Sequence, residues 1–379
     1  MIYIVIFIFT AGSFQIAAQK EGIIKKILIF LTIAIPVLFA ALRNYTVGID
    51  TGVYAWPLIQ RATQLSWNNF IKYSSIDGIE IGYAGLTYVC ANYIGGLPVL
   101  LGIAQLITIG FVFLRIWDFR KEAPVFVMSM MYMFLLYNRS FNLIRQCMAM
   151  AIVFYATRYI DNKKILFFAF VFVAMLFHNS AILGLVYMVI YYAATGKLGR
   201  TKASILIITT FILIASYNSL LFTIVKVVLG NAEKYLKYFQ ISASGHLSLY
   251  DIAFKAGAVI IILFMSASFW NSDILSDYSV AASGVVYKIE GKNISTRFIL
   301  MALFDLLLYF LTFYNGDSYR FSLYFQIMMP VIIPQVRKRF KRENRFIIDT
   351  MVILASFLNW YVFMIIGDGY GTIPYSFLT

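Results

Sequence analysis

The chain has 379 residues, of which 61% are hydrophobic and 13% are charged, and its mean hydropathy is +0.82. Soluble domains carry about 25% charged residues, so the composition excludes an ordinary soluble protein. Lysine and arginine outnumber aspartate and glutamate by 31 to 17. In a membrane protein this excess is typical of cytoplasmic loops. We therefore expect membrane lipids, and no nucleic acid, among its partners.

Hydrophobic segments of membrane-spanning length recur along the whole chain. A helix needs about 20 apolar residues to cross ~30 Å of hydrocarbon, whereas barrel strands would show alternating segments of about 10 residues. The segments lie at residues 2–18, 23–42, 97–117, 123–138, 140–160, 165–180, 181–195, 203–222, 251–270, 297–314, 319–336 and 346–366. They predict an all-α polytopic membrane protein of about 12 transmembrane helices, folded as a single domain over residues 1–379.

A further apolar stretch at 80–94 is short for a full crossing, and we expect a re-entrant or interfacial helix there. With the N-terminus outside, six loops face the cytoplasm and carry 21 of the 31 lysines and arginines, which agrees with the positive-inside rule. These loops are 19–26, 115–122, 158–164, 195–202, 271–297 and 337–345. Residues 43–79 and 223–250 then become large external loops.

Charged and titratable side chains from distant segments collect at the outer ends of the predicted helices. They are Arg43, Asp50, Glu80, Arg139, Arg145, His178 and Arg320. Arg145 is the most informative, because it lies roughly 7 Å inside its helix at 1.5 Å per residue, where a charge is costly. The spacing of Asn142 and Gln146 from Asn138 predicts one polar helix face that also carries Arg145.

Each of these residues also has a purely structural interpretation. Arg43 could lie at a helix end with its guanidinium reaching into the water at the membrane surface. Asp50 could form an Asx turn, and Glu80 could cap the next helix. The remaining interpretations are a solvated loop charge for Arg139, a core histidine for His178 and an ion pair with Asp317 for Arg320. Asp305 falls in the middle of a helix, where it must be protonated or paired with a basic group from another helix.

The sequence contains no motif for a metal or an organic cofactor. Cys90 and Cys147 lie in apolar surroundings and specify neither a disulfide nor a metal site. The C-terminal "GDGYG" has the glycines of a phosphate loop but not the strand and helix that such a loop requires. We therefore expect neither a metal nor a cofactor.

Five short motifs, taken together, resemble the EpsG-like family of bacterial membrane proteins, which is related to the Wzy polymerases of O-antigen, capsule and exopolysaccharide. In chain order the motifs are "LRNYTVGIDTGVY", "EIGY", "FNLIRQCMAMAI", "FHNSAI" and "YRFSLYF". The resemblance implies a multi-pass protein of the bacterial cytoplasmic membrane that joins oligosaccharide repeat units at its outer face. The units would be linked to undecaprenyl pyrophosphate, and a chain-length regulator protein is a candidate further partner.

In such a reaction an acceptor sugar hydroxyl attacks the anomeric carbon that bears the lipid pyrophosphate. Guanidinium groups suit the leaving pyrophosphate, and we expect Arg145 and Arg320, completed by Arg43, to bind it. The hydroxyl needs a general base, for which the candidates are Asp50, ranked slightly above Glu80, and His178, which could instead donate a hydrogen bond or shuttle a proton. Candidate contacts to the sugars or the carrier are Tyr54, Tyr83, Asn142 and Gln146.

Two other functions remain open at this stage. Another polyprenyl-phosphate-dependent glycosyltransferase, or a glycan ligase, would use the same arginines and differ only in its acceptor. A flippase for the lipid-linked unit would carry polar residues across the whole bilayer, often on helices that glycine or proline interrupts. The embedded charges gather at one face, apart from Asp305, and the chain has only 7 prolines. This pattern disfavours the flippase.

Overall fold

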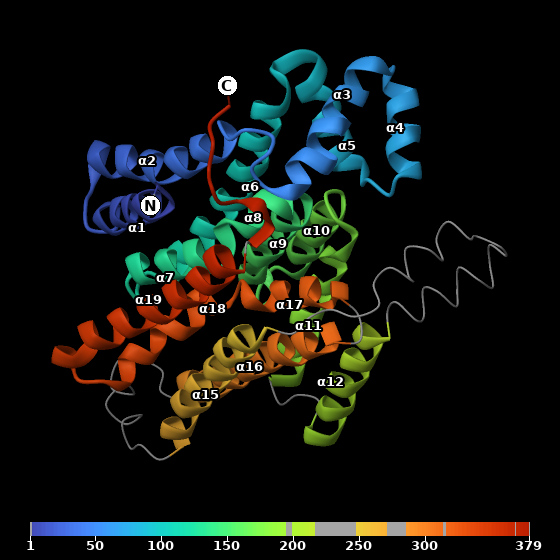
Figure 1. Cartoon of the computed structure of the whole chain (residues 1–379). Coiled ribbons are helices and arrows are strands. Elements are labelled where there is room, and N and C mark those ends of the chain that lie inside the picture. The colour runs from blue at the N-terminus through green and yellow to red at the C-terminus, as the bar shows by residue number, and fades with distance from the viewer. Residues whose placement is uncertain are drawn as a thin grey trace. The chain divides into compact units, whose positions relative to one another are not determined.

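The computed structural model describes residues 2–194, 199–216, 248–270, 286–313, 316–367 and 369–378. Within these ranges the regular structure is helical, apart from one isolated antiparallel bridge between Arg43 and Phe377. The chain forms two compact units, residues 1–182 with 337–379 and residues 183–336, and each is described by itself. Figure 1 shows the helices in chain order.

The first unit contains most of the predicted outer residues. Its helices are α1 (Ile2–Ala17), α2 (Gly22–Ala41), α3 (Trp56–Gln64), α4 (Trp67–Ile76), α5 (Ile81–Val89), α6 (Gly96–Asp118), α7 (Val125–Tyr132), α8 (Arg139–Asn142), α9 (Ile144–Ala156), α10 (Lys164–Met175) and α19 (Arg345–Tyr361). Helices α1 and α2 pack side by side, and α6 packs against both α2 and α9 (Figure 1). All residues of α9 are buried except Arg145 and Tyr155, which makes α9 the central helix of the first unit.

Four segments are long and apolar enough to cross a membrane: 22–41, 96–118, 296–313 and 342–366. Five shorter apolar helices lie at 2–17, 125–137, 164–175, 179–194 and 201–214. The prediction of a helical membrane protein is thereby confirmed. The number of about 12 crossings stays a prediction that rests on segment length.

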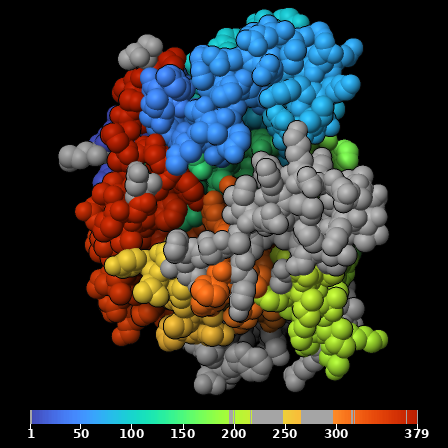
Figure 2. All heavy atoms as spheres, turned by 45° about the vertical axis from the view of Figure 1, so that its right-hand side comes forward, coloured from blue at the N-terminus to red at the C-terminus, as the bar shows by residue number. Residues whose placement is uncertain are grey.

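The predicted external loop 43–79 is in fact largely helical, since it contains α3 and α4. In Figure 2 these two helices form one continuous blue surface. The stretch 80–94 forms the short helix α5 and a π-helical turn, Cys90–Ile94, which ends at Gly95 with a φ of 117°. Fourteen helical residues cover only about 21 Å, so this element is too short to cross the bilayer, as predicted. The second predicted loop, 223–250, lies outside the described residues up to 247.

The predicted helix 140–160 is interrupted, which the sequence did not suggest. Leu143 has a φ of −87° and a ψ of 52°, and it separates α8 from α9. The carbonyl of Phe141 accepts hydrogen bonds from the Arg43 Nη2 and the Thr51 hydroxyl at 3.3 and 3.1 Å. Side chains that bind a helix carbonyl in this way are a recognised cause of a sharp break. The expected continuous polar face from Asn138 to Gln146 is therefore wrong.

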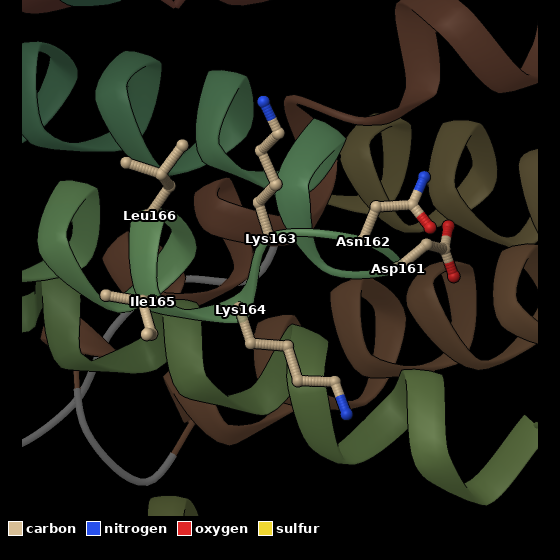
Figure 3. Close-up of a pocket in the computed structure, with 6 residues that line it drawn as sticks. All are labelled: Asp161, Asn162, Lys163, Lys164, Ile165 and Leu166. Carbon is tan, nitrogen blue, oxygen red and sulfur yellow. The ribbon is translucent and has the colours of Figure 1, made fainter.

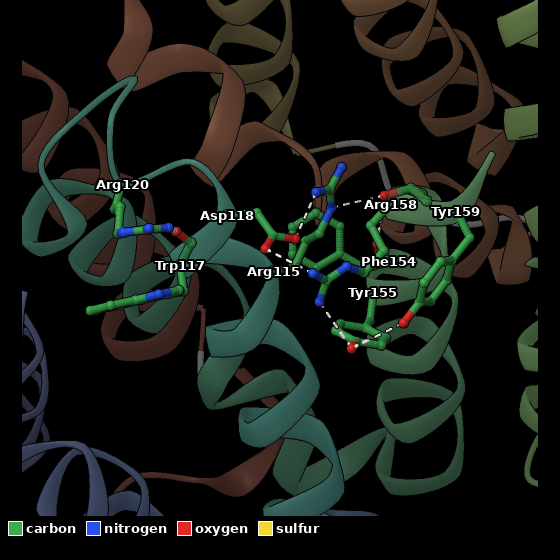
Figure 4. A network of polar contacts seen from close by, with 9 residues as sticks. Arg115, Trp117, Asp118, Arg120, Phe154, Tyr155, Arg158 and Tyr159 are labelled. Atoms are coloured by element: carbon green, nitrogen blue, oxygen red, sulfur yellow. Dashed lines mark hydrogen bonds and ion pairs between the residues drawn. The ribbon is translucent and has the colours of Figure 1, made fainter. Parts of the chain in front are cut away.

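One end of the first unit is basic and unites four of the loops predicted to be cytoplasmic. At the end of α6, Asp118 pairs with Arg115 at 2.9 Å and with Arg158, which follows α9, at 3.4 Å (Figure 4). Lys338 pairs with Glu122, and the Nζ of Lys25 lies 4.9 Å from the ring of Trp117. These contacts join loops 19–26, 115–122, 158–164 and 337–345.

The second unit contains α11 (Gly184–Ala194), α12 (Arg200–Ala215), α15 (Leu249–Trp270), α16 (Val286–Phe310), α17 (Tyr319–Gln326) and α18 (Met329–Ile332). Asp305 on α16 pairs with Lys255 on α15 at 2.5 Å, and both side chains are buried. One of the two alternatives for Asp305, a basic partner from another helix, is therefore confirmed. Helix α16 begins at Val286, inside the predicted cytoplasmic loop 271–297.

Close approach of two backbones fixes α5 in the first unit. The amides of Gly82 and Tyr83 donate to the carbonyl of Leu176, at 2.8 and 3.3 Å, directly after α10. A Cβ at Gly82 would lie 2.6 Å from that carbonyl oxygen, so only glycine fits.

We expect Gly82→Ala to lower the stability of the purified protein by about 1–3 kcal/mol, because the added methyl group forces α5 away from Leu176. Gly85→Ala on the same helix is the matched control, since its Cβ would meet nothing closer than 3.5 Å. The midpoint of thermal unfolding in detergent measures both variants. Equal midpoints for the two would contradict the close approach.

Candidate functional site

Arg145 lies in the first turn of α9, at the end of the helix opposite to the basic cluster of Figure 4. Its side chain is 31% exposed, whereas the rest of that turn is buried. Its Nη1 donates to the Oε2 of Glu80 at 2.5 Å and to the carbonyl of Gly78 at 3.3 Å. The sequence placed both charges at one membrane face but did not pair them.

Glu80 holds two segments together rather than capping its own helix. It occupies the N-cap position of α5, yet its side chain makes no capping bond, so the capping interpretation is wrong. Its side chain is 7% exposed, and its Oε1 accepts the backbone amide of Asn179 at 3.0 Å. The carboxylate thus joins the start of α5 to the start of α9 and to the turn after α10.

Asp50 reaches the same region through Asn142, the last residue of α8. The Asn142 Oδ1 accepts the backbone amide of Asp50 at 2.8 Å, and Asn142 is buried. The Asp50 side chain makes no capping bond to the helical turn that follows it and is partly exposed. Since Asn142 and Arg145 are three residues apart, neighbouring positions of one chain segment bind the backbone of Asp50 and the carboxylate of Glu80.

Tyr83 lies between these groups. Its ring is 5.9 Å from the Arg145 guanidinium, and the residue is 4% exposed. Burial raises the pKa of Tyr83 to about 12, while the charges of Arg145 and Arg43 lower it and that of Asp50 raises it. Three of the predicted charges therefore act on one hydroxyl. A buried ring does not offer its face to a sugar, so the described structure does not support stacking on Tyr83.

Arg43 is buried and holds the loop that carries Asp50. It is 2% exposed, and its Nη1 donates to the carbonyl of Ala40 at 2.8 Å, at the end of α2. Its Nη2 donates to the Thr51 hydroxyl at 3.2 Å and to the carbonyl of Phe141 at 3.3 Å. Burial lowers the pKa of Arg43 to about 10, which keeps the guanidinium charged at neutral pH. These contacts support a positioning role, and direct contact with pyrophosphate stays a prediction.

His178 follows α10 and precedes Asn179. The backbone amide of Ser180 donates to its Nδ1 at 3.2 Å, and the Ser180 hydroxyl lies 2.7 Å from the same atom. Because a backbone amide can only donate, Nδ1 must be unprotonated, and the neutral ring carries its proton on Nε2. In this tautomer Nε2 can donate a hydrogen bond but cannot accept a proton. The geometry thus favours the hydrogen-bonding role over the role of base.

The remaining predicted residues lie in different environments. Tyr54 is 59% exposed, and Gln146 is buried with its Nε2 3.7 Å from the Met150 sulfur. Arg139 is 4% exposed with its guanidinium 4.1 Å from the Phe363 ring, so the interpretation as a solvated loop charge is wrong. Arg320 is the second residue of α17 in the second unit, with its Nε 3.5 Å from the Tyr319 hydroxyl.

The two remaining expectations for Arg320 stay predictions. The side chain of Asp317 lies outside the described residues, so the pairing of Arg320 with it is not tested. The two units are each described by themselves, so pyrophosphate binding by Arg320 together with Arg145 is also not tested.

The C-terminal strap, residues 369–378, was not predicted from the sequence. Its carbonyls at Gly371 and Ser376 accept the amides of Gly48 and Asn44, both at 2.9 Å. Gly48 has a φ of 86°, and a Cβ there would lie 2.8 Å from the carbonyl oxygen of Phe141. Contacts between residues more than 300 positions apart leave no local pattern, so the strap could not be placed from the sequence.

Nothing in the described part of the chain suggests a metal centre, since no cluster of three histidine, cysteine, aspartate or glutamate side chains forms there. A surface hollow lies at the far end of α9 from Arg145 and is lined by residues 161–166. Figure 3 shows the side chains of Lys163 and Lys164 pointing apart there. The hollow contains none of the predicted site residues.

The fold and the site define a helical membrane protein with a cluster of charged and polar groups at one end of its first unit, opposite to a basic end. The EpsG family model matches residues 26–377, and the chain belongs to the EpsG family. The match covers nearly the whole chain and agrees with the resemblance seen in the sequence motifs. Neither the curated proteins nor the solved structures contain a match.

The Thr51 hydroxyl links Arg43 to Phe141, so its removal tests how the loop of Asp50 is held. We expect Thr51→Val to lower the stability by about 1–3 kcal/mol, because it removes one hydrogen bond from the buried Arg43 guanidinium and one from the Phe141 carbonyl. Thr63→Val, on the exposed face of α3, is the matched control. Thermal unfolding in detergent followed by size-exclusion chromatography reads out both, and a Thr51→Val protein as stable as the control would contradict the proposed link.

Proposed function

We propose that the protein polymerises a polysaccharide at the outer face of the bacterial cytoplasmic membrane. It joins oligosaccharide repeat units that are carried on undecaprenyl pyrophosphate. The acceptor sugar hydroxyl attacks the anomeric carbon of the donor, the new glycosidic bond forms, and the lipid pyrophosphate leaves. Membership of the EpsG family supports exopolysaccharide polymerisation of the Wzy type.

The observation that carries the proposal is the accessible Arg145 in an otherwise buried helix turn. It is paired with the Glu80 carboxylate, and the neighbouring Asn142 binds the backbone of Asp50. A leaving pyrophosphate gains negative charge, and a fixed guanidinium aimed at that charge is a large catalytic contribution. Arg145 meets this requirement, because its side chain is 31% exposed and is held in place by Glu80.

The attacking hydroxyl must lose a proton as the bond forms, which a positioned base assists by typically 10²–10⁴-fold. Asp50 suits this role, since it is partly exposed and its backbone amide is fixed by Asn142. His178 donates from Nε2 to a sugar or phosphate oxygen. Arg43, Thr51 and Gly48 keep the Asp50 loop against Phe141.

The experiment is a gel of the surface glycan from a strain that lacks the gene and carries an empty vector, the wild type, Arg145→Lys or Arg61→Lys. We expect single repeat units with the empty vector and a ladder with the wild type. Arg145→Lys should lose at least about tenfold of the polymer at equal protein level, because an ammonium cannot form the planar two-bond contact. Arg61→Lys, on the exposed surface of α3, should behave as the wild type.

A normal ladder from Arg145→Lys would remove this residue from the binding of pyrophosphate. If the strain without the gene lacks even single repeat units, the block lies at an earlier step. The alternatives of a glycosyltransferase that builds the unit, or a flippase, would then replace the polymerase.

The outward orientation of the site has its own test. Both native cysteines are buried, and they are replaced by alanine. A single cysteine at Tyr54, near the site, should react with a membrane-impermeant maleimide on intact cells, because the proposal places this end outside. A single cysteine at Lys121, at the basic end, should react only after the cells are permeabilised. The reverse pattern would overturn the orientation.

A further inference from the structure

Resting on the function proposed above, we propose that Glu80 is a positioning residue and not the general base. It holds Arg145 by one nitrogen, Nη1, and thereby presents the opposite edge of the guanidinium, formed by Nε and Nη2, to the donor's diphosphate. Arg145 has five N–H groups with which it can make these contacts.

Both hydrogen bonds of Arg145 leave from Nη1, one to the Glu80 Oε2 at 2.5 Å and one to the carbonyl of Gly78 at 3.3 Å. Within the described ranges, no acceptor contacts Nε or Nη2. These two nitrogens carry parallel N–H groups, the arrangement that binds two oxygens of a phosphate at once. The exposed fractions are consistent with an Arg145 edge that is accessible to a substrate. The Arg145 side chain is 31% exposed, whereas the Glu80 side chain behind it is 7% exposed.

Glu80 is itself fixed, which a positioning residue requires. Its second oxygen, Oε1, accepts the amide of Asn179 at 3.0 Å. The amides at the start of its own helix, those of Gly82 and Tyr83, are bound by the carbonyl of Leu176 instead. The Glu80 side chain therefore makes no helix-capping hydrogen bond, although such bonds are common at the N-cap position. Its Oε2 accepts a hydrogen bond from Arg145 instead.

The same contact argues against Glu80 as the base. In a displacement at an anomeric carbon the attacking oxygen and the leaving oxygen lie on opposite faces of the sugar, and catalytic groups that serve the two faces are separated by several ångströms. A carboxylate 2.5 Å from the nitrogen that neighbours the diphosphate lies on the leaving-group side. Asp50, whose backbone amide is bound by Asn142, is then the candidate base on the attacking side.

The test measures steady-state kinetics of the purified full-length protein in lipid nanodiscs. The donor and acceptor are lipid-linked repeat units extracted from the strain without the gene. The variants are Glu80→Gln and Asp50→Asn, with Glu122→Gln as the matched control, because Glu122 forms an exposed ion pair with Lys338 at the basic end.

We expect Glu80→Gln to raise the donor KM by roughly tenfold, the effect of one charge-assisted contact. It should change kcat much less and leave the acidic limb of the kcat–pH profile in place. Asp50→Asn should lower kcat by roughly 10²–10⁴-fold and remove that limb. The Glu122→Gln control should match the wild type in both constants.

The inference is overturned if Glu80→Gln lowers kcat as strongly as expected for Asp50→Asn and removes the acidic limb, since Glu80 would then be the base. It is also overturned if Glu80→Gln leaves both constants unchanged. A wild-type protein that joins no units would instead refute the proposed function, so the two failures are distinguishable.

A double-mutant cycle distinguishes a specific effect of Glu80 on Arg145 from a general folding defect. Because Glu80 acts through Arg145, adding Glu80→Gln to Arg145→Ala should change the donor KM less than twofold further. A full tenfold further increase in that background would show that Glu80 acts independently of Arg145 and would contradict the inference.

Discussion

The carbonyl of Phe141 is the acceptor on which the geometry of the site depends. In an uninterrupted helix it would bind the amide four residues later, that of Arg145. Instead it accepts the guanidinium of Arg43 and the hydroxyl of Thr51. The helix therefore ends at Asn142 and starts again at Ile144. This restart places Arg145 in a first turn, with an accessible side chain on a helix that is otherwise nearly all buried.

Burying Arg43 is costly, and its surroundings offset that cost. Three acceptors from three segments receive its N–H groups, and the Phe141 ring lies 4.3 Å from the guanidinium. The C-terminal strap covers the same loop, through the bridge between Arg43 and Phe377. Removing one partner of such a buried charge costs more than the pair itself contributes. We therefore assign Arg43 to the support of the site, and Arg145 to the contact with the substrate.

The sequence predicted those features that follow from local composition. Hydrophobic segments identified the helices, and the counts of lysine and arginine identified four loops that do meet at one end of the first unit. The cost of a charge inside a helix singled out Arg145, and Asp50, Glu80 and His178 were found because they accompany it at the other end.

The features of the site that the sequence did not predict depend on tertiary contacts. The pairing of Arg145 with Glu80 joins positions 65 residues apart, and no spacing rule relates them. The break at Leu143 depends on Arg43, about 100 positions earlier, so the local pattern still predicted a continuous helix. Burial of Tyr83 and Arg139 likewise depends on neighbours from other segments. Such contacts could have been anticipated only from covariation between positions, not from a single chain.

The most direct measurement of the central claim uses the purified protein alone, in nanodiscs, with extracted lipid-linked repeat units and no other protein. Glycan length and released undecaprenyl pyrophosphate are followed together. The account predicts a ladder of products and one released lipid pyrophosphate for each new glycosidic bond. Units that stay unjoined, or release of lipid pyrophosphate without chain growth, would contradict it.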